Sequence, residues 1–258
     1  MYLAIRLSIK PFGQSEIGVT CYNALRSPPQ RPSGPQDIEE NPVTKPANLP
    51  SYRYPLEELF QEFANPPAPG TVGGAAMQAA FAASLVAKAA RKTLGREGFE
   101  PMTEEMNRIV TRAESLSDGL QEAIDQDAIA ENRLSHAYAL PQNSAEELAV
   151  RRDCIALALS NQAKNPLSLA QSAKEVLELA ESVLRYGHPL STSSAFLAAR
   201  SAASAVMSCA LFALAKSREV PEIAEEIEGK ATLLWHGARS LDTELTLLSW
   251  ERIAKPQS

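Results

Sequence analysis

Residues 66–90 read PPAPGTVGGAAMQAAFAASLVAKAA, and this stretch decides the fold. The prolines up to Pro69 exclude a helix before that residue, whereas the glycines between Gly70 and Gly74 permit a tight turn. An alanine-rich run without helix breakers continues to about Leu94, which predicts a helix that opens directly from a glycine turn. The first N–H groups of a helix have no partner within it and lie at the positive end of its dipole. The stretch therefore predicts either a helix start that binds an anion or a carbonyl group, or an ordinary helix start.

The composition favours close-packed helices over sheets. The chain has 258 residues, of which 45% are hydrophobic and 6% aromatic, so the core must consist mostly of Ala, Leu, Val and Ile. A formal net charge of -6 argues against a nucleic-acid partner, because such a surface needs clustered Lys and Arg. No apolar run is expected to reach the roughly 18 residues that span a membrane. We therefore expect a soluble cytoplasmic protein with no membrane partner, a mitochondrial location being the less favoured alternative.

The cysteines and histidines predict neither a disulfide framework nor a metal site. They are few and stand far apart: Cys21, Cys154, Cys209, His136, His188 and His236. An odd number of distant cysteines is more typical of a reducing compartment than of a disulfide-stabilised domain. No pair among these six residues has the spacing of metal ligands.

A bundle of about seven helices is predicted over residues 51–255, after a Pro-rich extension over residues 1–50. Residues 1–10 alternate like a strand, but the remainder of the extension has too few apolar residues to fold, so we expect it to be mostly disordered. Ser144 and Glu147 form a capping box, and Pro166 is expected to open a new helix. The predicted helices cover residues 55–64, 74–94, 103–140, 144–164, 165–186, 195–216 and 221–255.

Two carboxylates interrupt the apolar stripe of the predicted helix 103–140. The stripe passes through Leu120 and Ile124, then reaches Asp127 and Glu131 before it resumes at Leu134. Burial of an unpaired carboxylate is costly, so one interpretation is a functional site on this face. The other interpretation is a solvated acidic band on a helix whose buried face shifts by one residue.

Polar residues elsewhere are further candidates. Arg200 stands in an Ala- and Ser-rich run, where an anionic ligand is a possible partner. His188 lies in a Gly-His-Pro break near Ser193 and Ser194, and a plain loop residue is the alternative interpretation.

Together, these segments resemble the cyclodeaminase/cyclohydrolase family of all-helical folate enzymes. The family's short helix, Pro-x-Pro-Gly-Gly-Gly-Ser turn and Ala-rich helix match residues 55–64, 67–73 and 74 onward. A later Asp-x-x-Ala segment with a Leu-Pro ending, and a Pro-Leu helix start, match the following residues: Asp127, Ala130, Ala137, Leu140, Pro141, Pro166 and Leu167. The resemblance covers residues 54–248.

The chain also departs from the family pattern. Thr71 and Val72 replace glycines, and these β-branched residues resist any positive φ that the turn requires. Glu131 replaces an aromatic residue, and the family's asparagines between Val206 and Leu214 are absent. Where the family has a Gly-Asn turn and a Ser-Asp pair, the chain has these residues: Gly187, His188, Ser193 and Ser194.

The resemblance implies a one-carbon enzyme that acts on the formimidoyl or methenyl group of tetrahydrofolate by general acid/base catalysis. Asp127 is the implied catalytic carboxylate, with no metal and no cofactor besides the folate substrate, and the protein is expected to be a homodimer. The implied substrate-binding residues are Gly70, Thr71, Val72, Gly73, Gly74, Glu131, His188, Ser193 and Ser194. The alternative is a non-catalytic helical scaffold that kept the bundle and lost the site.

Overall fold

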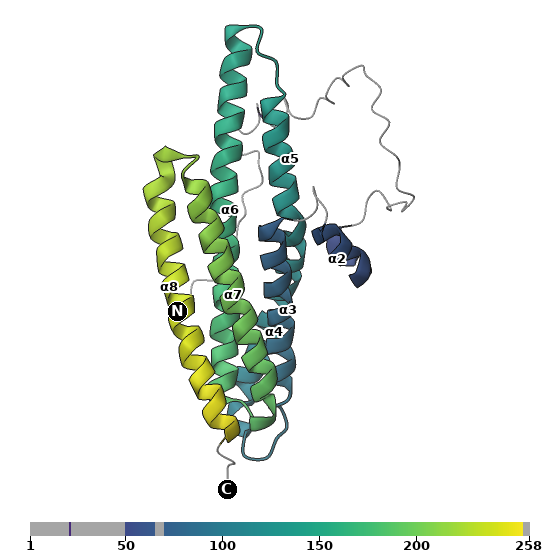
Figure 1. Cartoon of the computed structure of the whole chain (residues 1–258). Coiled ribbons are helices and arrows are strands. Elements are labelled where there is room, and N and C mark those ends of the chain that lie inside the picture. The colour runs from purple at the N-terminus through teal and green to yellow at the C-terminus, as the bar shows by residue number, and fades with distance from the viewer. Residues whose placement is uncertain (1–20, 22–49, 65–69, 255–258) are drawn as a thin grey trace. The chain divides into compact units, whose positions relative to one another are not determined.

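The structure is a computed structural model that describes Cys21 and residues 50–64 and 70–254 (Figure 1). The described residues are helical and contain no strand, which confirms the all-α prediction. The α-helices are α2 (Leu56–Ala64), α3 (Thr71–Arg91), α4 (Thr103–Glu122), α5 (Gln126–Tyr138), α6 (Ala145–Tyr186), α7 (Thr192–Ser217) and α8 (Pro221–Ala254). The short 3₁₀ helices are η1 (Ser51–Arg53), η2 (Glu100–Met102), η3 (Ala123–Asp125) and η4 (Pro189–Ser191). Apart from Cys21 and Pro50, the predicted extension lies outside the described residues, and its disorder stays a prediction.

The chain divides into two compact units. The larger unit comprises residues 48–129 and 162–258. In it α3 packs against α4 and α7, and α7 also packs against α8. Alanine makes up most of the buried residues of α3 and α7. Its small side chain lets neighbouring helices approach closely, so this core is the close-packed one that the composition predicts.

Two predicted helix boundaries are wrong. The helix expected over 103–140 is divided by η3 into α4 and α5, and the break expected at Pro166 is absent because α6 continues through it. Proline costs a helix about 3 kcal/mol because it lacks an N–H group and crowds the preceding turn. Here Ala163, Leu167 and Ala170 are buried around Pro166, and the core contacts of that face outweigh the cost.

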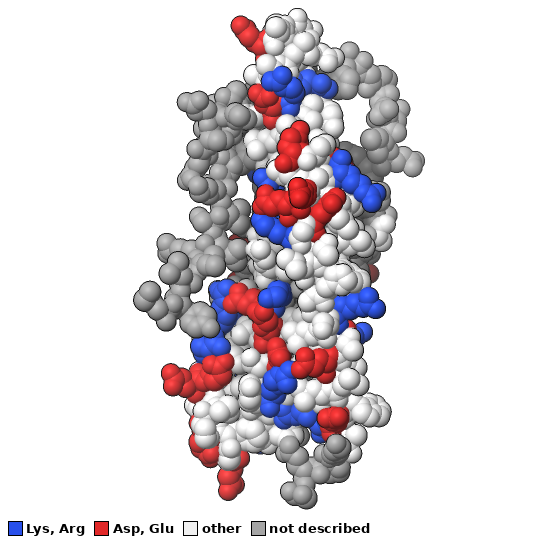
Figure 2. Space-filling view, turned by 90° about the vertical axis from the view of Figure 1, so that its left-hand side faces the viewer, with Lys and Arg blue, Asp and Glu red and all other residues white. Residues whose placement is uncertain are grey.

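The expectation that no segment is long and apolar enough for a membrane span is also wrong. Thr71–Arg91 and Pro189–Ser217 both have the necessary length and composition, although more than half of the apolar stretch of each is buried inside the protein. A core helix passes the same test, and the absence of a membrane partner stays a prediction. Figure 2 shows one face of the molecule, on which acidic and basic side chains are intermixed without a continuous basic area.

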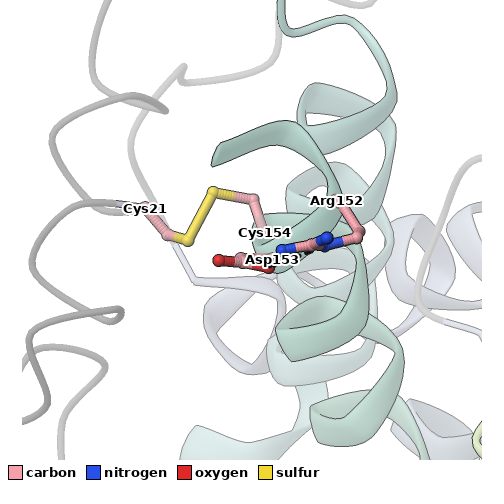
Figure 3. Close-up of a disulfide and its surroundings, with 4 residues drawn as sticks. All are labelled: Cys21, Arg152, Asp153 and Cys154. Atoms are coloured by element: carbon pink, nitrogen blue, oxygen red, sulfur yellow. Dashed lines mark hydrogen bonds and ion pairs between the residues drawn. A yellow bond between two sulfur atoms is a disulfide. The ribbon is translucent and has the colours of Figure 1, made fainter. Parts of the chain in front are cut away.

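The smaller unit contains Ala130–Asn161 together with Cys21. Cys21 and Cys154 form a disulfide with a Cα–Cα distance of 5.4 Å (Figure 3), so the expectation that the cysteines form no disulfide is wrong for this pair. Both cysteines are buried with Ala137, and Leu140, Val150, Ile155 and Leu157 pack around them. The bond joins residues separated by 133 positions, a pairing that only the fold reveals.

The capping box predicted at the start of α6 is confirmed. Glu147 N donates to Ser144 Oγ at 3.1 Å, and Ser144 N donates to Glu147 Oε2 at 3.2 Å. Each side chain thus satisfies a backbone donor that the helix leaves unpaired.

Replacing Ser144 with Ala is expected to lower the free energy of unfolding by about 1 kcal/mol, because Glu147 N loses its acceptor. Urea denaturation followed by far-UV circular dichroism measures this loss. Ser135→Ala, at an exposed position on α5, is the control and should change stability by less than about 0.5 kcal/mol. Equal stabilities for the two variants would show that the cap contributes nothing.

Candidate functional site

The N-terminus of α3 is the centre of the candidate site. Gly70 is the N-cap residue with φ -77° and ψ -162°, and the helix begins at Thr71. The predicted glycine turn is therefore wrong, because Gly73 and Gly74 already lie in the helix. Among the described residues only Gly95 and Gly98 have a positive φ. Thr71 and Val72 consequently fit this helix start without the strain that their β-branched side chains would meet in a left-handed turn.

The side chain of Asp127 caps this helix start. Its Oδ2 accepts a hydrogen bond from Val72 N at 3.3 Å. The carboxylate also lies against Gly70, since a Cβ atom at that position would be only 2.3 Å from Oδ2. A negative charge here is favoured by the dipole of α3. The anion predicted at this helix start is therefore a side chain of the protein itself, brought there from a distant part of the sequence.

The 3₁₀ turn η3 places Asp127 by turning the chain just before it. Ile124 is buried in the core and anchors this turn. Asp125 Oδ2 accepts a hydrogen bond from Ser51 N at 3.0 Å, at the start of η1. Two carboxylates of one short segment thus accept hydrogen bonds from two separate backbone N–H groups, and Asp127 is half-buried.

Glu131 does not share this environment. It is exposed on α5, whose buried residues are Ala130 and Ala137. The expectation of two carboxylates on a buried face is therefore wrong for Glu131. The buried face of the helix shifts after η3. Glu131 therefore belongs to a solvated acidic band, the second interpretation of the sequence, whereas Asp127 lies at the candidate site, as the first interpretation expects.

Cys209 of α7 is a residue of this site that the sequence pattern did not single out. It is fully buried, and burial, followed by the negative charge of Asp127, raises the pKa of its thiol from 9.0 to about 12. Cys209 lies in the segment from Val206 to Leu214, where the family's asparagines are absent. That departure is the one feature of the sequence that points to this position. Phe63 of α2 lies close to Gly74 in the first turns of α3, where an added Cβ would be 3.6 Å from Cε1 of Phe63.

Cys209 is expected to stay protonated and unreactive in the folded protein, because a thiol reacts as its thiolate. Cys209 is the free cysteine among the described residues, so a disulfide reagent at pH 8 should titrate almost no thiol before unfolding and one after it. The pKa of the Cys209 thiol is higher in the folded protein than in the unfolded chain. The thiol therefore contributes its full stabilisation of the fold below about pH 9. That contribution should disappear as the pH rises toward about 12, and Cys209→Ser is the control that lacks it. Fast labelling of the native protein would contradict this environment.

The predicted residues His188, Ser193 and Ser194 lie near the C-terminal end of α3, from the start of η4 to the first turn of α7. His188 N donates to Thr93 Oγ1 at 2.9 Å, and its Nδ1 accepts from Leu190 N at 3.1 Å. Lys92 Nζ donates to Ser194 Oγ at 3.1 Å, while Ser193 is exposed. In this arrangement His188 caps η4, as the loop-residue interpretation expects.

The structure therefore divides the predicted binding residues into two groups. Gly70, Thr71, Val72, Gly73 and Gly74 lie with Asp127 at the start of α3, and His188, Ser193 and Ser194 lie beyond its end. The 21 residues of α3 place these two ends about 30 Å apart. Arg200 joins neither group and pairs with Asp242 of α8.

Comparisons with known proteins give a matching family, a related sequence and a related structure. The sequence model of the formiminotransferase-cyclodeaminase family matches residues 55–222. A methenyltetrahydrofolate cyclohydrolase from Methylorubrum extorquens is 32% identical over 162 residues, which cover 62% of this chain and 78% of that protein. The crystal structure of formiminotetrahydrofolate cyclodeaminase from Thermotoga maritima has a TM-score of 0.64 and 20% identity, covering 78% of this chain and 96% of that one. At this identity the structural likeness shows a shared fold.

Proposed function

Because the chain belongs to the formiminotransferase-cyclodeaminase family, we propose that it is an enzyme that acts on a one-carbon derivative of tetrahydrofolate at Asp127. The observation that carries this proposal is the half-buried Asp127 carboxylate, held against Gly70 and the Val72 N–H group beside buried Cys209. Within the family, hydrolysis of the methenyl group is the activity we favour. The relative at 32% identity is named for it, whereas the cyclodeaminase at 20% identity supports the fold.

In the proposed reaction Asp127 moves one proton. Water adds to the methenyl carbon between the two folate nitrogens, and Asp127 accepts the proton that the attacking water loses. Asp127 passes that proton to the ring nitrogen as the bond between this nitrogen and the carbon breaks. The remaining hydroxyl proton of the adduct is released to solvent as the formyl C=O forms on the other nitrogen, which balances the positive charge of the methenyl group. In the deaminase direction the second folate nitrogen attacks the formimidoyl carbon and loses its proton to Asp127, which then protonates the amino group that leaves as ammonia. In both routes the step assigned to Asp127 is proton transfer, and the folate is the substrate.

The residues around Asp127 support such a role. The N–H group of Val72 holds Oδ2 of Asp127 in place. Positioning of this kind keeps a general base aligned with the atom from which it takes a proton. The Cys209 thiol keeps its proton, so the Asp127 carboxylate has a neutral neighbour. Asp127 can therefore act as the base of the site without competition from a thiolate.

A non-catalytic folate-binding or scaffold protein is the second candidate. It is favoured by the departures from the family pattern at Thr71, Val72 and Ser194, and by the absent asparagines between Val206 and Leu214. Such a protein would keep the bundle without turnover.

Assays of the purified full-length protein separate these candidates. Loss of methenyl absorbance reports hydrolysis of methenyltetrahydrofolate, and a coupled ammonia assay reports deamination of the formimidoyl derivative. Titration calorimetry with 5-formyltetrahydrofolate, a stable analogue, reports binding. Turnover of either substrate supports the enzyme, binding without turnover supports the non-catalytic protein, and no heat up to about millimolar ligand would exclude a folate site.

A further inference from the structure

The smaller unit of the chain has a very small core, and the disulfide lies at its centre. Besides Cys21, the unit comprises the last part of α5, the connection after it and the first part of α6. The described residues of this unit that are buried are Cys21, Ala130, Ala137, Cys154 and Ala158. The side chains that pack around the cysteines are only partly buried. Because an alanine side chain buries little apolar surface, the covalent bond is the strongest link within this unit.

The bond between Cys21 and Cys154 joins residues 133 positions apart. A disulfide stabilises a fold mainly by restricting the unfolded chain, and the effect grows with the length of the closed loop. The larger unit has an extensive core of its own, with contributions from α3, α4, α6 and α7. Reduction of the bond is therefore expected to open the smaller unit locally while the larger unit stays folded.

Helix α5 connects this cluster to the candidate site. It runs from Gln126 to Tyr138, with Asp127 near its first end and Ala137 near its last. Ala137 packs against the two cysteines, and Ala130 is the other buried residue of α5. A helix of 13 residues is only marginally stable in water without packing. The position of Asp127 therefore depends on contacts at the far end of the same helix.

We propose that the bond between Cys21 and Cys154 is a redox switch that controls turnover at Asp127. This inference rests on the proposed function. In the oxidised form the bond holds the end of α5, so that Asp127 Oδ2 keeps its hydrogen bond from Val72 N. In the reduced form α5 frays from that end and Asp127 loses its alignment. A disulfide in a reducing compartment, the kind of compartment that the cysteine count predicts, is usually transient and redox-sensing.

The switch operates by thiol–disulfide exchange with a dithiol reductant. A thiolate of the dithiol attacks one sulfur of the bond, the S–S bond breaks, and the other cysteine leaves as a thiolate that takes up a proton. The second thiol of the reductant then attacks the mixed disulfide and releases the remaining cysteine as a thiol. The protein gains two electrons and two protons, and the dithiol loses the same and becomes a disulfide. Oxidation of the switch is the reverse reaction with that disulfide.

The reductant reaches the bond through local opening of the smaller unit. Cys21 is 1% exposed and Cys154 is 2% exposed, so no reagent contacts the sulfurs in the closed form. The small core of the unit makes such opening accessible.

Hydrogen exchange of the full-length protein tests the structural part of the switch. Exchange is followed by mass spectrometry with oxidised or reduced dithiothreitol present, and alkylation confirms the state of the cysteines. Amides of residues 128–138 and 145–158 are expected to exchange roughly tenfold faster in the reduced protein, whereas those of α7 and α8 keep their rates. Cys154→Ser should show the faster rates in both reagents. Equal exchange of the oxidised and reduced proteins, or cysteines that stay reduced in the oxidised reagent, would overturn the inference.

Steady-state assays in the same two reagents test the control of turnover. Reduction is expected to lower kcat roughly tenfold or more, and oxidised dithiothreitol should restore it. Cys154→Ser should have the low kcat in both reagents. Ala156→Ser introduces the same residue at an exposed position of α6 and should respond like the wild type. An equal kcat in the oxidised and fully reduced proteins would contradict the switch. Faster exchange on reduction without turnover in either state would instead overturn the proposed function, so the two failures are distinguishable.

Discussion

Asp127→Asn is expected to lower turnover by roughly a hundredfold to ten-thousandfold while the protein stays folded. The amide oxygen of Asn still accepts the hydrogen bond from Val72 N, so the cap of α3 survives, but the side chain no longer takes a proton. Steady-state assays with the methenyl and formimidoyl substrates measure the loss of turnover. Urea denaturation measures stability, which should change by less than about 1.5 kcal/mol.

Two companion variants separate catalysis from capping. Asp127→Ala removes both the proton acceptor and the cap, so it should lose turnover and also about 1 kcal/mol of stability. Asp125→Asn changes the neighbouring carboxylate, which binds Ser51 N, and should leave turnover close to that of the wild type. Equal turnover in Asp127→Asn and wild-type protein would remove Asp127 from the mechanism.

Gly70→Ala is expected to lower turnover by about a hundredfold, through displacement of Asp127 by about 1 Å. A Cβ atom at this position would lie 2.3 Å from Oδ2 of Asp127 and 3.3 Å from its Cγ, so the carboxylate must move. Stability should change less than activity, since the atom that moves is the end of a side chain. The same assays and urea denaturation measure both effects.

Gly119→Ala is the matched control for Gly70→Ala. Gly119 lies exposed on α4 with no atom within 4 Å of an added Cβ, so alanine there should be neutral or stabilising by up to about 1 kcal/mol. The double variant of Gly70→Ala and Asp127→Asn should be no less active than Asp127→Asn alone, because both act through one carboxylate. Additive losses would show that Gly70 acts independently of Asp127, for example by contacting the substrate.

The sequence predicts features that depend on neighbouring residues better than features that depend on distant ones. The capping box of Ser144 and Glu147 is correct because its two partners lie one helical turn apart. Asp127 is marked as unusual by its place on an apolar stripe, but its acceptance of the Val72 N–H bond requires the packed bundle. The break expected at Pro166 reflects a local preference that core packing overrides.

The two-group arrangement of the predicted site has the same explanation. Motif similarity assigns Gly70 and His188 to one site because both belong to one family pattern. A motif does not say how far apart its residues lie in the folded chain. The structure supplies that distance as the length of α3. A single cysteine in an alanine-rich helix forms no pattern, so the sequence does not mark Cys209. The pKa of its thiol depends on burial and on Asp127, which only the fold brings close.

The bond between Cys21 and Cys154 closes more than half of the chain into a covalent ring that includes α2, α3, α4 and α5. Any single backbone cut inside this ring leaves the two fragments joined through sulfur. A protein nicked by a protease between these cysteines would therefore migrate near its full mass without a reducing agent and separate into two bands with one. Proteins that look intact on a non-reducing gel can thus contain cleaved chains, and the first step in judging a preparation is to compare both lanes.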